Sequence, residues 1–186
     1  MVSRQIEMVS SFKRVQGSPY FLRTARIAFR CWSRDDLPLA MNLWGDHEVT
    51  KYLGGPFSPQ QVRAKLDTEI ATMEAHGIQY WPFFLLPDFD HAGCCGLRPR
   101  KPDERIYELG VHICKAYWGR GLAVEASRAI GNYAFETLGA KELFAGHHPD
   151  NAASRHMLEK SGFIYTHDEL YPPTGEMHPG YVLRRT

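Results

Sequence analysis

The segment YELGVHICKAYWGRGLAVEA, residues 107–126, constrains the fold most, because a strand pattern runs through a glycine turn into a helix pattern. Apolar residues alternate over 106–113, which predicts a strand, and helix-forming residues from about 120 to 138 predict a long helix. The first N–H groups of a helix have no internal partners and lie at the positive end of its dipole. Glycines let a ligand approach that backbone, so the segment predicts a site for a phosphate or pyrophosphate.

Two other interpretations of the glycine turn have to be weighed. A plain strand-to-helix turn would explain the triplet Gly119, Arg120, Gly121 on its own, with the glycines serving only the backbone conformation. The spacing does not match the nucleotide-binding P-loop. It does not match the dinucleotide fingerprint either, because no third glycine follows Gly119 and Gly121 at the required spacing. Neither nucleotide motif is therefore expected here.

The rest of the chain alternates between strand and helix patterns. Helices are expected after SRDDL (33–37), from Ser58 to about residue 76 with Pro59 at its first position, over 120–138 and over 150–162. Strands are expected at 25–32, 78–87, 91–99, 106–113, 141–148, 163–171 and 180–185. This order predicts the α/β class (α+β mixed), with about seven strands in a mixed sheet flanked by about four helices.

Composition excludes several classes of partner. The 186 residues are 44% hydrophobic and 23% charged, as in an ordinary soluble domain, and the net charge of +1 gives no general case for binding nucleic acid or membrane. No apolar segment is long enough for a signal peptide or membrane span. The four cysteines form no CxxC pair, which indicates reduced thiols in a cytoplasmic protein. We expect residues 1–21 to be a loose polar arm and 22–186 to be one domain.

A second motif is DNAASRHMLEKSGF, residues 150–163. Asn151 falls at or next to the N-cap of the predicted helix, and Gly162 is placed to end it. On its own, Asn151 is better explained as a helix cap than as a ligand contact. Histidines near residue 148 lack the spacing of a known zinc motif, so no metal site is expected. Cys114 has no evident His–Asp relay, which disfavours a covalent acyl-enzyme.

Together, the two motifs resemble the GCN5-related N-acetyltransferase (GNAT) superfamily. YWGRGLAVEA is similar to its acetyl-CoA pyrophosphate loop, [QR]-x-x-G-x-[GA], with Trp118, Gly121 and Ala123 at the three fixed positions. NAASRHMLEKSGF and GDHEVTKYLGGPFS (45–58) resemble the branch of ribosomal-protein N-terminal (Rim-like) acetyltransferases. The resemblance covers residues 22–186 and implies a mostly antiparallel mixed sheet, with acetyl-CoA as the acyl donor.

The resemblance also implies roles for individual residues. The backbone from Gly119 to Ala123, including Arg120 and Leu122, would hold the pyrophosphate, with Trp118 beside it. The strand edge at His112 and Ile113 would pair with the pantetheine arm. Asn151 would bond the pantetheine, and Ser154 would lie near the thioester.

Acetyl transfer to an amine requires an unprotonated nitrogen, so a general base is expected. The two-residue period of the strand places Glu108, Gly110 and His112 on one face, opposite Leu109. Glu108 stands where the family often carries a carboxylate and is the first candidate base. His112 is the second candidate, because the histidine pKa range suits the task.

The sequence leaves the general acid open. Many superfamily members use a tyrosine of the last helix to protonate the leaving thiolate, whereas this chain has Leu158. Ser154 is the nearest alternative, and the substrate ammonium or water is another.

The expected function is acetyl-CoA-dependent transfer to a primary amine, either a protein N-terminus or a small molecule, by direct attack in a ternary complex. A non-catalytic CoA-binding module of the same fold and an unrelated nucleotide-binding enzyme are the alternatives. The acceptor cannot be read from the sequence, nor can the choice between monomer and homodimer. Candidate lining residues of the acceptor cleft are Trp44, Tyr52, Trp81, Tyr171 and His178, although core packing is the better explanation for any one of them.

Overall fold

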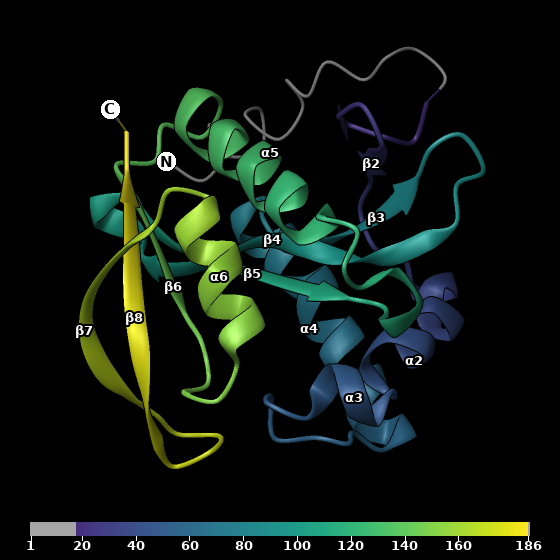
Figure 1. Cartoon of the computed structure of the whole chain (residues 1–186). Coiled ribbons are helices and arrows are strands. Elements are labelled where there is room, and N and C mark those ends of the chain that lie inside the picture. The colour runs from purple at the N-terminus through teal and green to yellow at the C-terminus, as the bar shows by residue number, and fades with distance from the viewer. Residues whose placement is uncertain (1–17, 186) are drawn as a thin grey trace.

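The computed structural model describes residues 18–185, which form one sheet of eight strands with helices on both faces (Figure 1). The sheet order is β1-β2-β3-β4-β5-β6-β8-β7. β5 and β6 are parallel, and every other neighbouring pair is antiparallel. The predicted mixed α/β class is confirmed. Most of the predicted N-terminal arm lies outside the described residues.

The strands are β1 (Leu22–Arg23), β2 (Ile27–Phe29), β3 (Tyr80–Leu85), β4 (His91–Lys101), β5 (Ile106–Ile113), β6 (Glu142–Gly146), β7 (Ile164–Tyr171) and β8 (Glu176–Arg184). The α-helices are α2 (Leu37–Trp44), α3 (His47–Thr50), α4 (Pro59–His76), α5 (Leu122–Glu136) and α6 (Ala152–Lys160). Short 3₁₀ turns are η1 (Arg34–Asp36), η2 (Pro102–Glu104) and η3 (Lys115–Tyr117).

The start of α4 follows the sequence signal closely. Ser58 Oγ accepts a hydrogen bond from the Gln61 N–H at 3.3 Å, and Gln61 Oε1 accepts one from the Ser58 N–H at 2.8 Å. This reciprocal pair is a capping box, and Pro59 takes the first helical position, where its missing N–H costs nothing. Gly77, with φ of 70°, ends the helix in the left-handed conformation.

The first predicted strand is in fact a hairpin. The chain turns at Thr24, whose N–H donates to the Ile27 carbonyl at 2.9 Å and whose Oγ1 accepts from the Ile27 N–H at 3.1 Å. This turn divides the region into β1 and β2. β8 also starts at Glu176, four residues before the predicted start at Gly180, because it pairs with β7 along nearly its full length. The division of the first strand raises the strand count from about seven to eight.

Two apolar clusters cover the two faces of the sheet. One contains Leu109 of β5 with buried residues of α5 and α6, such as Ile130 and Leu158. The other contains Tyr80 and Cys94 with buried residues of α2 and α4. We call the second face of β3, β4 and β5, which carries Tyr80, Cys94, Arg98, Glu108 and His112, the α4-side face.

The sheet is open between its two parallel strands. β5 and β6 pair only at Ile106–Glu142, Tyr107–Leu143 and Glu108–Phe144. Beyond Glu108 both strands continue, to Ile113 and Gly146, but they diverge (Figure 1). Residues 109–113 therefore keep β4 as a neighbour on one edge and have no paired strand on the other.

Candidate active site

Glu108 lies on the α4-side face where β5 parts from β6. Its carboxylate is 4.0 Å from Arg100 Nη1, and its side chain is 39% exposed, so a ligand can reach it. Burial raises the pKa of Glu108 above its ordinary value, against the opposing effect of Arg98 and Arg100. A carboxylate with a raised pKa and an accessible oxygen can accept a proton more readily than an ordinary surface glutamate.

His112 lies two positions further along the same face and is held by Trp44. Trp44 Nε1 donates a hydrogen bond to His112 Nδ1 at 3.1 Å, so Nδ1 must be unprotonated and the ring proton sits on Nε2. Burial lowers the pKa of His112 to about 3, assisted by the positive charges of Lys65 and Arg98. His112 is therefore a neutral ring near pH 7, with one N–H to donate.

Tyr80 covers the position between these two side chains. A Cβ on Gly110 would lie 2.4 Å from the Tyr80 ring and hydroxyl, so glycine is required there for the ring to lie over β5. Arg98 stacks on the other side, with its guanidinium carbon 4.4 Å from the ring centroid, and donates to Glu69 Oε1 at 2.6 Å. Glu69 also accepts from the Tyr80 N–H at 2.8 Å. Through Glu69, α4 thus fixes Tyr80 and Arg98, which lie beside Glu108.

The predicted anion site has the geometry that its sequence implies. Gly119 and Gly121 both have φ of 73°, a left-handed conformation that favours glycine. α5 begins at Leu122, and no side chain caps its first N–H groups. A Cβ on Gly119 would meet no atom within 4 Å, so the turn is open to a ligand.

A clamp that sequence reasoning missed holds this turn against the β1–β2 hairpin. Arg26 Nη1 donates to the Arg120 carbonyl at 2.9 Å, and Arg26 Nε donates to Glu125 Oε2 at 2.6 Å. Thr24 Oγ1 donates to Glu125 Oε1 at 2.5 Å. An acidic residue in the first turn of a helix was the available signal, but its partners lie about a hundred residues away in the chain.

Trp118 lies at the mouth of the strand opening. Its indole is 47% exposed, yet Nε1 donates to the Ile113 carbonyl at 2.8 Å. The bond ties the glycine turn to the last residue of β5. The unpaired edge of β5 and the glycine turn therefore adjoin each other.

At the start of α6, Asn151 acts as the N-cap: its Oδ1 accepts from the Ser154 N–H at 3.0 Å. Ser154 itself is half-buried. Leu158 is 1% exposed and belongs to the α5-side core, so the position of the usual family tyrosine is apolar here.

The α3–α4 loop contacts both the β6–α6 loop and the β7–β8 hairpin. Tyr52 packs on His148 with ring centroids 4.9 Å apart, and a Cβ on Gly54 would lie 3.6 Å from the Pro173 carbonyl. Tyr171 stacks on His178 at 4.6 Å. Trp81, however, is fully buried in the core of the α5 side, so the prediction that it lines an acceptor cleft is wrong. It sits one residue out of phase with Tyr80 on β3.

His148, Glu176 and His178 form a group whose nitrogen and oxygen atoms lie within 4.8 Å of one another. His148 Nδ1 accepts from the Asp150 N–H at 3.1 Å, which leaves the proton of the neutral ring on Nε2. Nε2 lies 2.7 Å from Glu176 Oε2, a hydrogen-bond distance. In this tautomer the nitrogen that faces Glu176 is a donor, whereas metal ligation requires a lone pair there.

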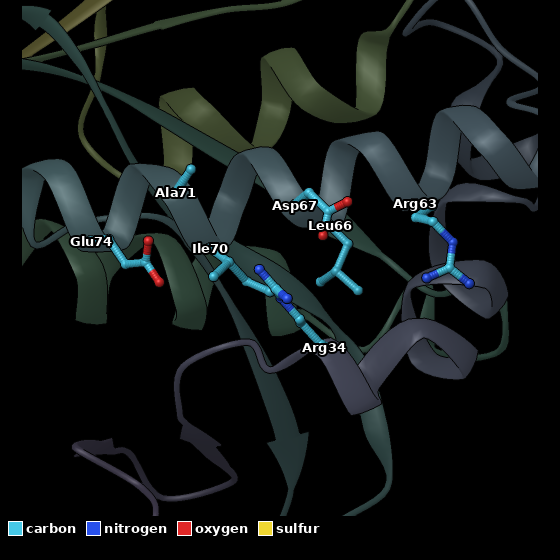
Figure 2. A pocket seen from close by; sticks show the side chains of 7 residues that line it. All are labelled: Arg34, Arg63, Leu66, Asp67, Ile70, Ala71 and Glu74. Atoms are coloured by element: carbon cyan, nitrogen blue, oxygen red, sulfur yellow. The ribbon is translucent and has the colours of Figure 1, made fainter.

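A separate groove runs along the outer side of α4 (Figure 2). Its walls are polar and charged side chains with a few apolar ones, and Arg34 reaches it from η1: Arg34, Arg63, Leu66, Asp67, Ile70, Ala71 and Glu74. No residue of the α4-side face lines it. The groove is thus distinct from the cluster around Glu108.

The sheet opening between the parallel strands β5 and β6 lies next to the uncapped N-terminus of α5, and these two features form the framework of the candidate site. The family model for the acetyltransferase (GNAT) domain matches residues 26–164, and the chain belongs to this family. It is therefore an acyltransferase that uses acetyl-CoA.

Individual relatives and solved structures are similar to this chain. The chain is 29% identical over 147 residues to YkkB of Bacillus subtilis, across 78% of this chain and 86% of YkkB. It is 26% identical to the N-acetyltransferase p20 of Bacillus licheniformis, across 76% and 81% of the two chains. Its fold is similar to that of RimL, the ribosomal L7/L12 α-N-protein acetyltransferase in complex with coenzyme A, with a TM-score of 0.75, 14% identity, and coverage of 87% and 95%.

The geometry fits the donor. An extended pantetheine arm can pair with a free strand edge, and residues 109–113 of β5 present one. A pyrophosphate suits the uncapped start of α5. No helix among residues 18–185 has the length and apolar character needed to cross a bilayer.

Proposed function

We propose that the protein transfers an acetyl group to a primary amine by direct attack in a ternary complex, with Glu108 as the general base. The observation that carries this proposal is the position of Glu108. Its side chain lies on the α4-side face, and Glu108 is the last residue of β5 that pairs with β6. An amine brought to that face would meet a carboxylate next to the free edge of β5.

The donor would be held along one continuous path. Backbone groups of His112 and Ile113 would pair with the pantetheine arm. The turn and first helical residues Gly119, Arg120, Gly121, Leu122 and Ala123 would bind the pyrophosphate, with the exposed Trp118 beside them. At the start of α6, Asn151 would contact the pantetheine through its side-chain amide, since its Oδ1 is engaged by Ser154.

The protonation state of the acceptor amine determines what Glu108 would have to do. Bound acetyl-CoA supplies an activated acyl carbonyl. An alkyl ammonium has a pKa near 10 and an N-terminal ammonium one near 8, so Glu108 would remove a proton, directly or through water, before the nitrogen attacks. Glu108 is positioned for this because it is accessible and its pKa is raised.

His112 suits a different role from that of a base. Its Nδ1 is occupied by Trp44, and its low pKa disfavours proton uptake near neutrality. We therefore assign it to the wall of the site, where Nε2–H can donate a hydrogen bond. Since Leu158 cannot donate a proton, Ser154 or the proton released by the amine would neutralise the departing thiolate.

The acceptor is a small molecule or a peptide that carries a primary amine. The name of RimL supports a protein N-terminus as one class. The low identity to that structure gives no further detail, and the protein is proposed to act as a monomer or a homodimer.

The test is Glu108→Gln, assayed for turnover between pH 5.5 and 9 with acetyl-CoA and a panel of amines. Wild-type kcat should fall as the pH drops toward the raised pKa of Glu108, because the protonated carboxyl cannot accept a proton. The variant should lose about 10²- to 10⁴-fold in kcat and lose that acidic limb, with unchanged acetyl-CoA affinity by calorimetry.

Glu104→Gln serves as the matched control, because Glu104 is an exposed glutamate in η2, just before β5. It should behave as wild type. A Glu108→Gln enzyme with wild-type turnover and an intact acidic limb would remove Glu108 from the mechanism.

A further inference from the structure

Some charged groups on and around the α4-side face have a close partner of opposite charge, and others do not. Arg98 is engaged by Glu69 at 2.6 Å, and Arg100 is engaged by Glu169 at 2.5 Å. One further anion, Glu108, stands 4.0 Å from Arg100. One further cation, Lys65 of α4, has no carboxylate oxygen within 4.0 Å among residues 18–185.

Aromatic rings hold Lys65 in place. Its Nζ lies 5.2 Å from the centroid of Trp44 and 5.8 Å from that of Phe57, and the side chain is half-buried. Trp44 is the residue that donates to His112, so the ammonium sits at the His112 end of the face. Burial lowers the pKa of Lys65, and the positive charge of Arg98 acts in the same direction. Glu69 opposes both effects, but it is already bound to Arg98 and to the Tyr80 amide.

A half-buried cation without a counter-ion is costly, and binding an anion relieves that cost. Lys65 of α4 contributes a positive group beside Trp44, the residue that bonds His112, and Glu108 contributes a negative group on β5. Glu108 and His112 are four residues apart on β5, which corresponds to about 13 Å between their Cα atoms. A ligand with an ammonium and a separate anionic group would match both.

We propose that the acceptor amine carries a carboxylate several bonds from its nitrogen, and that Lys65 binds this carboxylate while the amine lies toward Glu108. This inference rests on the proposed function and adds the chemical class of the acceptor. Lys65 is then a specificity-determining residue. Trp44 and Phe57 fix the position of its ammonium, so that the carboxylate is bound in one orientation.

The experiment compares amino acids with their uncharged amides: 3-aminopropanoate, 4-aminobutanoate and 6-aminohexanoate against the corresponding amino amides. The wild type should favour the acids by about 10- to 100-fold in kcat/KM, as expected for a hydrogen bond between charged groups. Lys65→Met should reduce that ratio to about one by losing activity on the acids alone. Lys65→Arg should keep most of the preference.

Arg63→Met is the matched control. It removes one positive charge from the same helix, but on the outer side, where Arg63 lines the groove of Figure 2. Its acid-to-amide ratio should equal that of the wild type. The affinity for coenzyme A should be the same in all four proteins, which excludes an effect of Lys65 on the donor.

Calorimetric binding of each acid and amide to protein saturated with coenzyme A gives a second readout that needs no turnover. If no amine is acetylated but the acids bind in a Lys65-dependent way, the proposed function fails, and the part of this inference that stands is the binding of an amino acid through Lys65. If amines are acetylated with no acid preference, or if Lys65→Met weakens acids and amides alike, this inference is overturned and the proposed function stands.

Discussion

Burial keeps His112 neutral, and Trp44, 68 positions away in the chain, adds a hydrogen bond that fits only the neutral ring. The indole N–H can donate only to an unprotonated Nδ1, so it stabilises the neutral ring, and burial acts in the same direction. The alternation along β5 was sufficient to predict which face carries Glu108 and His112. It could not reveal Trp44, because α2 reaches His112 only through the tertiary fold. For that reason the usual pKa of histidine was a poor guide to its role.

This arrangement predicts the titration of one ring. In wild-type protein, the NMR signals of His112 should not shift between pH 5 and 8, whereas an ordinary histidine titrates near 6.5. Trp44→Phe removes the donor and should raise the pKa of His112 by about 0.5 to 1 unit, the equivalent of one hydrogen bond. A wild-type His112 signal with a midpoint near pH 6.5 would contradict this account.

At the scale of elements, the glycine turn and α5 form a unit that the local sequence could predict. The helix start and the glycine positions, on which the proposed anion site rests, depend on residues within about ten positions of one another, as in 117–126. The clamp by Arg26 and Thr24 on Glu125 depends on the hairpin at the other end of the chain. No local pattern in the sequence predicts which residues meet in that contact.

The turn can be tested with two substitutions of similar size. Gly121 has space for a side chain, since an added Cβ would lie 3.8 Å from its nearest neighbour, and both Asn and Asp tolerate its left-handed φ. Gly121→Asp places a negative charge where the pyrophosphate would bind and should weaken coenzyme A binding at least about 10-fold relative to Gly121→Asn. Calorimetry measures the difference, and equal affinities would argue against a phosphate site at this turn.

The open edge of β5 predicts a local change in hydrogen exchange. Amides of residues 109–113 that point toward β6 have no strand partner and should exchange faster than those paired with β4. Coenzyme A should slow the first group if its pantetheine arm pairs with that edge. The amides between β6 and β8, which are paired throughout, provide the reference.

At the scale of the whole molecule, buried histidines should set the stability between pH 6.5 and 4. Burial lowers the pKa of His91 to about 4 and that of His112 to about 3, from an ordinary value of 6.5. The unfolded chain therefore binds more protons in this range, so the free energy of unfolding is highest above pH 6.5 and decreases as the pH falls. The slope should be up to about 1.4 kcal/mol per pH unit for each histidine.

His91→Phe isolates one of these protons. His91 packs against Trp32 and Phe84, so a phenylalanine ring fits its surroundings chemically. Urea denaturation at intervals from pH 7 to 4.5 should give a slope reduced by about one proton relative to wild type. An unchanged slope would mean that His91 is protonated in the folded protein.

The short pairing of β5 with β6, over three residue pairs, affects how well the folded protein resists degradation. β5 and β6 are paired at only three positions, and a bound pantetheine arm would add contacts along the free edge of β5. Ligands that bind only the folded form raise its free energy of unfolding in proportion to the logarithm of their concentration. We therefore expect the resistance of this protein to proteolysis to increase with the concentration of coenzyme A. The abundance of the protein should then rise and fall with that concentration.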